Sequence, residues 1–228
     1  MRRACLAPLL LLVGACAATP EPLAEPFDVL LLGDSISIGY TPHVRAALEG
    51  RARVVRPMNA SGRGAQNCQG TNHGVQRLED WLVIDGGGWE VIHFNFGLHD
   101  LKRVEPGSGS NSKDPGHPHQ AEPERYEAQL RELTERLQET GARLVFASTT
   151  PVPPQVGGPY RAPEDALVYN AIAARVMGDM GVPIDDLFAF VAAGPDGWQK
   201  PRDVHFTAEG SRALGGEVAR VILRTAGH

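Results

Sequence analysis

Cysteine is scarce in this chain of 228 residues, which contains three. Two of them, Cys5 and Cys16, belong to an N-terminal segment that we expect to be processed, so Cys68 is the lone cysteine of the remainder. A single cysteine excludes an internal disulfide, and the fold must therefore be stabilised by its hydrophobic core. Cys68 has no recognisable catalytic partner in its neighbourhood, and we interpret it as a partly buried structural residue.

Long apolar runs, basic clusters and nucleotide-binding loops are also lacking. The apolar stretch within residues 6–16 is shorter than the roughly 20 residues that a membrane-spanning helix needs. The net charge is −5 and no basic run occurs beyond the N-terminus, so nothing favours a nucleic-acid partner. The sequence contains no Gly-x-Gly-x-x-Gly motif, phosphate-binding loop or internal repeat. We therefore expect a small-molecule or glycan substrate and no cofactor.

The N-terminus has the pattern of an export signal. Met1-Arg2-Arg3 precedes a short apolar stretch and small residues, which is typical of a signal peptide over residues 1–16. Val13-Gly14-Ala15-Cys16 is similar to a bacterial lipobox, which implies lipid attachment to Cys16; ordinary cleavage nearby is the alternative. Residues 17–26, rich in proline and alanine, would form a tether. We expect an exported protein, either a periplasmic or outer-membrane-anchored lipoprotein or a secreted one.

Residues 27–228 are enough for one folded domain. Short apolar runs, typical of strands buried on both faces, alternate with amphipathic helical patterns. The strands are predicted at residues 27–32, 52–56, 90–96, 143–147 and 182–184. The helices are predicted at residues 41–48, 74–82, 123–140, 162–180 and 207–224. This alternation favours an α/β fold, a three-layer α/β/α sandwich around a mainly parallel sheet of about five strands.

Parallel sheets place their functional sites at the carboxyl ends of their strands, and three polar segments are expected there. They are residues 33–37, residues 97–100 and the neighbourhood of His205. Ser35 follows a strand and a glycine, so it can present its hydroxyl at the sheet edge while its own N–H faces a developing oxyanion. Ser35 is therefore the predicted nucleophile, although Gly-Asp-Ser by itself also forms ordinary turns and helix caps.

Four segments resemble, in the same order, the sequence blocks of the SGNH hydrolases, or GDSL esterases. They are Gly33-Asp34-Ser35, Asn59-Ala60-Ser61-Gly62-Arg63-Gly64, Gly97-Leu98-His99-Asp100 and Asp203-Val204-His205-Phe206-Thr207. The resemblance spans nearly all of residues 27–228 and implies the flavodoxin-like SGNH hydrolase fold. It also implies that Ser35 is the nucleophile and His205 its base, with the N–H groups of Ser35 and Gly64 in the oxyanion hole.

The third segment departs from the family pattern at His99. The family usually has an asparagine here, whose side chain donates a hydrogen bond to the oxyanion. A neutral imidazole can also donate from one ring nitrogen, so we assign His99 to the oxyanion hole. Two alternatives stay open: His99 only fills the loop, or Asn95 donates instead, although its place near the end of a strand could direct it into the core.

The last segment departs from the pattern at the acid. The family commonly places an aspartate three residues before the histidine, but here Arg202 has that position and Asp203 is two residues before His205. An orienting carboxylate has to reach the Nδ1 side of the ring. An altered turn would bring Asp203 there and complete a Ser-His-Asp triad. Alternatively, a backbone carbonyl orients His205, which leaves a Ser-His dyad.

We give other polar residues structural interpretations. Asp34 is expected to stabilise the turn at the nucleophile or to cap the helix after it. Asp100 is expected to bond loop amides, and His93 to be a buried or face residue of its strand. His117 and His119 have no third ligand in view, so no metal site is predicted.

The resemblance implies an ester hydrolase that forms an acyl-enzyme on Ser35. The loop at residues 106–123 is polar, which favours a water-soluble ester such as an acetylated carbohydrate over a lipid. Arg63, Lys102 and Arg103 could meet an acidic substrate, but we interpret them as solvated surface charges. A lipid or thioester hydrolase, and a non-catalytic binding protein on the same fold, are the alternatives.

Overall fold

The computed structural model describes residues 26–228, which form a sheet of five parallel strands in the order β2-β1-β3-β4-β5. The strands are β1 (Phe27–Leu32), β2 (Ala52–Val55), β3 (Val91–Phe94), β4 (Arg143–Ala147) and β5 (Ile184–Asp185). The helices are α1 (Ser35–Ala47), α2 (Thr71–Leu82), α3 (Pro123–Gln138), α4 (Pro163–Met180), α5 (Leu187–Ala192) and α6 (Ala208–Ala226), with a 3₁₀ turn at Ile84–Gly86. The predicted signal peptide, Cys16 and the tether up to residue 25 lie outside the described residues.

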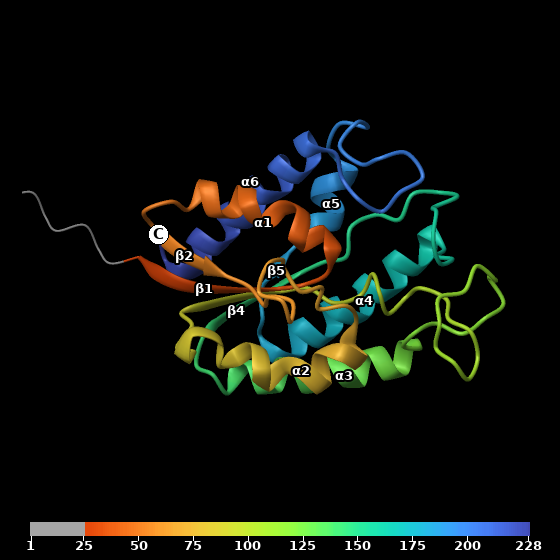
Figure 1. The fold of residues 1–228 in the computed structure, drawn as a ribbon, viewed down its shortest axis with the longest axis horizontal. Coiled ribbons are helices and arrows are strands. Elements are labelled where there is room, and N and C mark those ends of the chain that lie inside the picture. Colours follow the sequence, from red (N-terminus) through yellow and green to blue (C-terminus); the bar gives the residue numbers. More distant parts are fainter. Residues whose placement is uncertain (1–25) are drawn as a thin grey trace, which may run out of the picture.

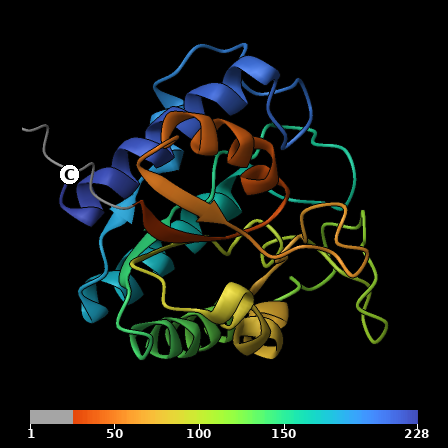
Figure 2. The same cartoon turned by 60° about the vertical axis from the view of Figure 1, so that its left-hand side comes forward.

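The sheet is the middle layer of three. Figure 1 shows α1 and α6 covering one face of the sheet, and α2, α3 and α4 covering the other; Figure 2 shows the same layers from a second direction. The strands are apolar on both faces because both are covered, and Val29, Leu30 and Leu32 are fully buried. The predicted three-layer α/β/α fold is therefore confirmed. None of the helices in residues 26–228 is long and apolar enough to span a membrane.

The order of the strands positions the site. The chain crosses from β1 to β2 on one side and then returns to β3 on the other side of β1, which is the flavodoxin-like order. At such a reversal the loops after the two neighbouring strands diverge and leave a crevice beyond their carboxyl ends. Ser35 follows β1 and the Gly97–Asp100 segment follows β3, so both lie at this crevice.

Several predicted boundaries are wrong. Helix α1 begins at Ser35 rather than residue 41, because the carboxylate of Asp34 caps it by accepting a hydrogen bond from the Ile36 N–H at 2.8 Å. Pro42, the second residue of the helix predicted at residues 41–48, lies inside α1. Helix α2 begins at Thr71, three residues earlier than residue 74.

The C-terminal part of the chain, from residue 182 to residue 192, also departs from the prediction in two places. The short helix α5, capped by Asp186, was not predicted, because six residues carry too little periodicity to be recognised. Strand β5 covers Ile184–Asp185 rather than residues 182–184, because the Val182 N–H still bonds to Met177 O and ends α4.

Candidate active site

The hydroxyl of Ser35 lies at the N-terminus of α1, where the chain leaves β1. The Asp34 carboxylate is buried and caps the helix, and burial raises its pKa. Ser35 itself is only partly buried. The positive end of the helix dipole at this place favours negative charge that develops near Ser35. The local sequence thus presents a reachable hydroxyl on a rigid turn, as predicted.

The structure brings His205 onto that hydroxyl, although the two residues are far apart in sequence. His205 Nε2 lies 2.9 Å from Ser35 Oγ, and His205 Nδ1 lies 2.7 Å from Asp203 Oδ1. The Asp203 carboxylate folds back onto its own turn, where Oδ1 also accepts the His205 backbone N–H at 3.1 Å, and this lets a carboxylate only two residues before the histidine reach Nδ1. The hydrogen bond from the His205 N–H is the largest cause of the lowered pKa of the Asp203 carboxyl.

In this geometry the group in contact with His205 Nδ1 is a carboxylate, and not the backbone carbonyl considered as the alternative. A carboxylate on Nδ1 holds the proton there and leaves Nε2 as an acceptor for the serine hydroxyl. The arrangement can thus perform base-assisted nucleophilic attack.

The two backbone N–H groups that the resemblance assigns to an oxyanion hole have no partner in the described part of the chain. Within residues 26–228, neither the Ser35 nor the Gly64 N–H donates a hydrogen bond. Gly64 lies in a loop closed by the hydrogen bond from Asn59 N to Gly64 O at 2.8 Å, and a Cβ on Gly64 would lie 3.0 Å from Asn59 Nδ2. This leaves the N–H of Gly64 free to bind a ligand oxygen.

His99 is mostly buried after β3 and makes no side-chain hydrogen bond in the described part of the chain; its Nδ1 is fully enclosed. Burial, followed by the charges of Lys102 and Arg161, lowers the pKa of His99 to about 3. The ring is therefore neutral at physiological pH and retains a single N–H donor. Asn95 is engaged elsewhere, since its amide donates to Ala147 O at 2.7 Å.

A sequence profile decides the family. The profile of the GDSL-like lipase/acylhydrolase family matches residues 31–213, from β1 into α6. The chain belongs to this family. It is accordingly an ester hydrolase, and the resemblance recognised in the sequence is confirmed. No curated protein matches the chain in sequence.

Solved structures share the acylhydrolase fold at low sequence identity. An acetyl xylan esterase, AlAXEase, superimposes with a TM-score of 0.64 at 14% identity, covering 86% of this chain and 100% of the other. A lipase/acylhydrolase from Enterococcus faecalis gives 0.60 at 18% identity, with 86% and 95% covered. A GDSL-like lipase from Bacteroides thetaiotaomicron gives 0.62 at 14% identity, with 89% and 92% covered.

Three residues near the acylhydrolase site were missed or misread in the sequence. Arg56 was treated only as a strand end, yet it is buried and donates hydrogen bonds to Gly33 O, Ser37 Oγ, Thr41 Oγ1 and Gln66 O. Arg56 therefore connects the turn that carries Ser35 to the segment after β2. Lys102, interpreted as a solvated charge, is 8% exposed, and Arg161, which no motif marks, is also 8% exposed.

The other polar residues have the structural roles expected of them. Asp100 accepts hydrogen bonds from the N–H and the hydroxyl of Thr71, and burial raises its pKa to about 6. His93 lies 3.1 Å from Asp185, and both are buried. The thiol of Cys68 is fully rather than partly buried, and burial raises its pKa to about 11, so it is no nucleophile near neutral pH.

His117 and His119 bind neighbouring carboxylates instead of forming a metal centre. His119 lies between Glu122, at 3.0 Å, and Asp165, at 3.1 Å. In residues 26–228 no group of three or more His, Cys, Asp or Glu side chains could hold a metal ion.

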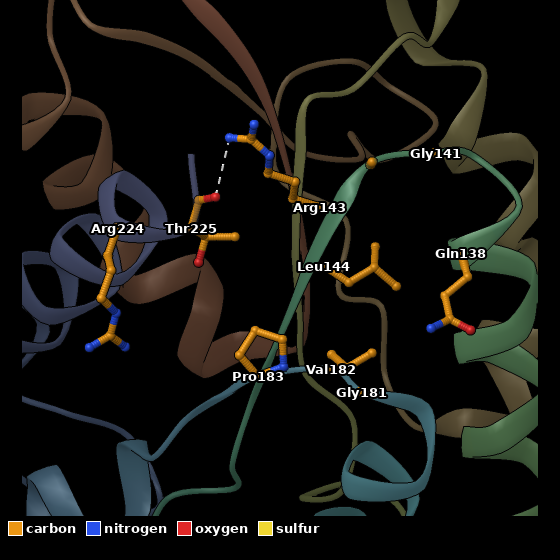
Figure 3. A pocket seen from close by; sticks show the side chains of 10 residues that line it. Gln138, Gly141, Arg143, Leu144, Gly181, Val182, Pro183, Arg224 and Thr225 are labelled. Atoms are coloured by element: carbon orange, nitrogen blue, oxygen red, sulfur yellow. Dashed lines mark hydrogen bonds between the residues drawn. The ribbon is translucent and has the colours of Figure 1, made fainter. Parts of the chain in front are cut away.

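A broad concavity occurs at the opposite edge of the sheet, by the amino ends of β4 and β5 (Figure 3). Arg143, which reaches toward the Thr225 carbonyl, and Arg224 are its charged residues. Its lining contains no serine, cysteine, histidine or carboxylate, and so offers no nucleophile with a base. We therefore assign the reaction to the carboxyl edge.

His99 supports a test of the oxyanion hole. His99→Ala is expected to lower kcat by about 10²-fold, and His99→Asn by less than about tenfold, because the asparagine amide restores a donor. Since the pKa of His99 is about 3, its protonation does not contribute to the pH–rate profile between about pH 5 and 9. The profiles of wild type and His99→Asn should therefore superimpose. A displaced acidic limb in the variant would contradict this assignment.

Proposed function

We propose that this ester hydrolase removes small acyl groups such as acetyl from a water-soluble alcohol, with carbohydrate as the substrate class. The observation that carries the proposal is the continuous contact from Asp203 through His205 to Ser35, with separations of 2.7 and 2.9 Å. These are hydrogen-bond distances, and the order of groups is that of a nucleophile, its base and an orienting acid.

In the proposed reaction, His205 Nε2 takes the proton of Ser35 as its oxygen attacks the ester carbonyl. The N–H groups of Ser35 and Gly64, with the neutral ring of His99, stabilise the negative oxygen of the tetrahedral intermediate. His205 then protonates the leaving alkoxide, which yields the free alcohol and an acyl-Ser35. Water, deprotonated by His205, attacks this ester, and the carboxylic acid leaves as Ser35 recovers its proton. Asp203 keeps the other ring nitrogen protonated.

The space beside the nucleophile turn is small, although neither Ser35 nor His205 is among the residues that line it. The cavity beside the nucleophile turn has room for about one water molecule and is lined in part by Asp34, Asn95 and Leu98. A long acyl chain would need a larger apolar channel or an exposed apolar surface. The polar loop at residues 106–123 and the fold likeness to an acetyl xylan esterase also support an acetylated carbohydrate. Export through the predicted signal at residues 1–16 would be compatible with such a substrate.

The test is the release of acid from a graded set of esters. Wild-type protein is given aryl acetate, butyrate and octanoate, acetylated xylo-oligosaccharides and an acyl thioester, with Ser35→Ala as the blank and Ser108→Ala as the matched control. Ser108 is an exposed serine in the polar loop, so its variant should behave as wild type. We expect Ser35-dependent release that is fastest for acetyl.

The alternatives give different results. A preference for octanoate or for the thioester would favour a lipid or thioester hydrolase. Equal background release by wild type and Ser35→Ala on every ester would indicate a binding protein.

A further inference from the structure

Two cations lie beneath the surface at the same edge of the sheet as Ser35. Lys102 is in the turn after β3 and Arg161 is in the loop before α4, and each is 8% exposed. Lysine and arginine are almost never so deeply buried unless a carboxylate pairs with them. The next question is therefore which groups balance the charge of each of these two side chains.

Neither cation has a carboxylate partner in residues 26–228. Arg161 donates only from Nε, to Leu98 O at 3.0 Å, and Lys102 makes no side-chain hydrogen bond there. Their charged ends are not among the fully enclosed atoms without a partner, so these ends remain open to solvent or a ligand. Arg56 provides the contrast, since its two Nη atoms donate four hydrogen bonds to protein oxygens.

The two cations are close to the reactive groups. Leu98, whose carbonyl binds Arg161, lines the cavity beside the nucleophile turn together with Asp34. The charge of Arg161 lowers the pKa of Lys102 and partly opposes the effect of burial on Asp34. The charges of both Lys102 and Arg161 depress the pKa of His99. The geometry agrees with this, because Arg161 Nε binds the carbonyl of Leu98, next to His99, and the Arg103 N–H donates to Tyr160 O at 2.9 Å. The segments that carry Lys102 and Arg161 therefore lie side by side next to His99.

The nearby carboxylates Asp100 and Asp34 favour the charged forms of Lys102 and Arg161 only from a distance, without an ion-pair contact. Asp34 caps α1 and Asp100 binds Thr71, and neither lies within ion-pair distance of Lys102 or Arg161. Two like charges in a poorly solvated place repel each other and lose hydration, unless an anion binds between them. The planar guanidinium matches a carboxylate in particular, because it can donate two parallel hydrogen bonds.

We propose that Arg161 and Lys102 bind a carboxylate carried by the substrate beside its ester, so that the enzyme acts on acylated acidic sugars such as uronic acids. This inference rests on the proposed function and specifies its substrate class. The acidic sugar donates its acyl group to Ser35 while its carboxylate is held by Arg161 and Lys102.

The test uses a matched pair of substrates: an O-acetylated methyl glucuronoside with a free carboxylate, and its neutral methyl ester. The measured product is acetate. We expect wild type to release acetate from the sugar with the free carboxylate with a kcat/KM about tenfold or more above that for the neutral methyl ester. Added salt should reduce this ratio by screening the attraction. Arg161→Met and Lys102→Met should each bring the ratio towards one, and Arg161→Lys should leave an intermediate ratio. Arg51→Met, an exposed arginine at the amino edge of the sheet, removes the same charge and should keep the wild-type ratio.

Binding is measured separately from turnover by titrating methyl glucuronoside and methyl glucoside into Ser35→Ala by calorimetry. Selective binding of the acid that is lost on adding Lys102→Met supports the proposal. Equal binding and equal hydrolysis of the two sugars would overturn it, while Ser35-dependent hydrolysis would leave the proposed function intact. A changed pH profile in Arg161→Met without a changed ratio would also overturn it, since the cations would then act only on His99.

Discussion

Replacing His205 by glutamine is expected to lower kcat/KM for an acetyl ester by about 10⁴-fold or more. The glutamine amide cannot accept the proton of Ser35 near neutral pH, although it fills a similar volume. Ser35→Ala is expected to cause a comparable loss. The measurement is the initial rate of aryl acetate hydrolysis, corrected for the spontaneous rate.

Combining the two substitutions sharpens this test. The 2.9 Å contact between His205 Nε2 and Ser35 Oγ implies that the residues act as one unit, so the double variant should lose no more activity than either single variant. His43→Gln, on the half-buried side of α1, is the matched control and should stay within about threefold of wild type. Losses that multiply in the double variant would show that the two residues do not act as nucleophile and base.

The contact between Ser35 and His205 was largely predictable, because a short sequence segment marks each of the two residues. A serine after a strand and a histidine before a helix are local signals, and the parallel-sheet rule places both at one edge. The position of Asp203 was not decided by its spacing, since its contact with the ring depends on a local turn in which the carboxylate accepts the His205 backbone N–H. Sequence reasoning left that alternative open, and the 2.7 Å contact with His205 depends on the folded loop.

Residues whose role depends on distant contacts were not predictable. Arg161 carries no motif, and Lys102 resembles any loop lysine; their burial arises because the loops after β3 and β4 pack together. The same limitation applies to the fold. The five strands were recognisable from their apolar runs, but the start of α1 was not, since the capping role of Asp34 outweighs the usual meaning of a Thr-Pro pair.

Arg56→Met is expected to lower the free energy of unfolding by about 4 kcal/mol. Arg56 is 2% exposed, and the substitution keeps the apolar stem while removing all four hydrogen bonds from its Nη atoms. The oxygens that lose a donor, including Gly33 O and Gln66 O, remain buried or partly buried. For a domain of this size such a change corresponds to a melting temperature lower by about 8–16 °C. Urea unfolding followed by circular dichroism measures it.

Arg53→Met is the matched control for this prediction. Arg53 lies on β2, three residues before Arg56, and binds the carboxylates of Asp28 at 2.6 Å and Asp85 at 2.9 Å, but its side chain is 45% exposed. Solvent-exposed ion pairs contribute little, so this variant should lose less than about 1 kcal/mol. Equal losses in the two variants would mean that the hydrogen bonds of Arg56 are no more valuable than surface contacts. Since Arg56 joins the turn before Ser35 to the segment after β2, Arg56→Met should also lower kcat at temperatures where the protein remains folded, and Arg53→Met should not.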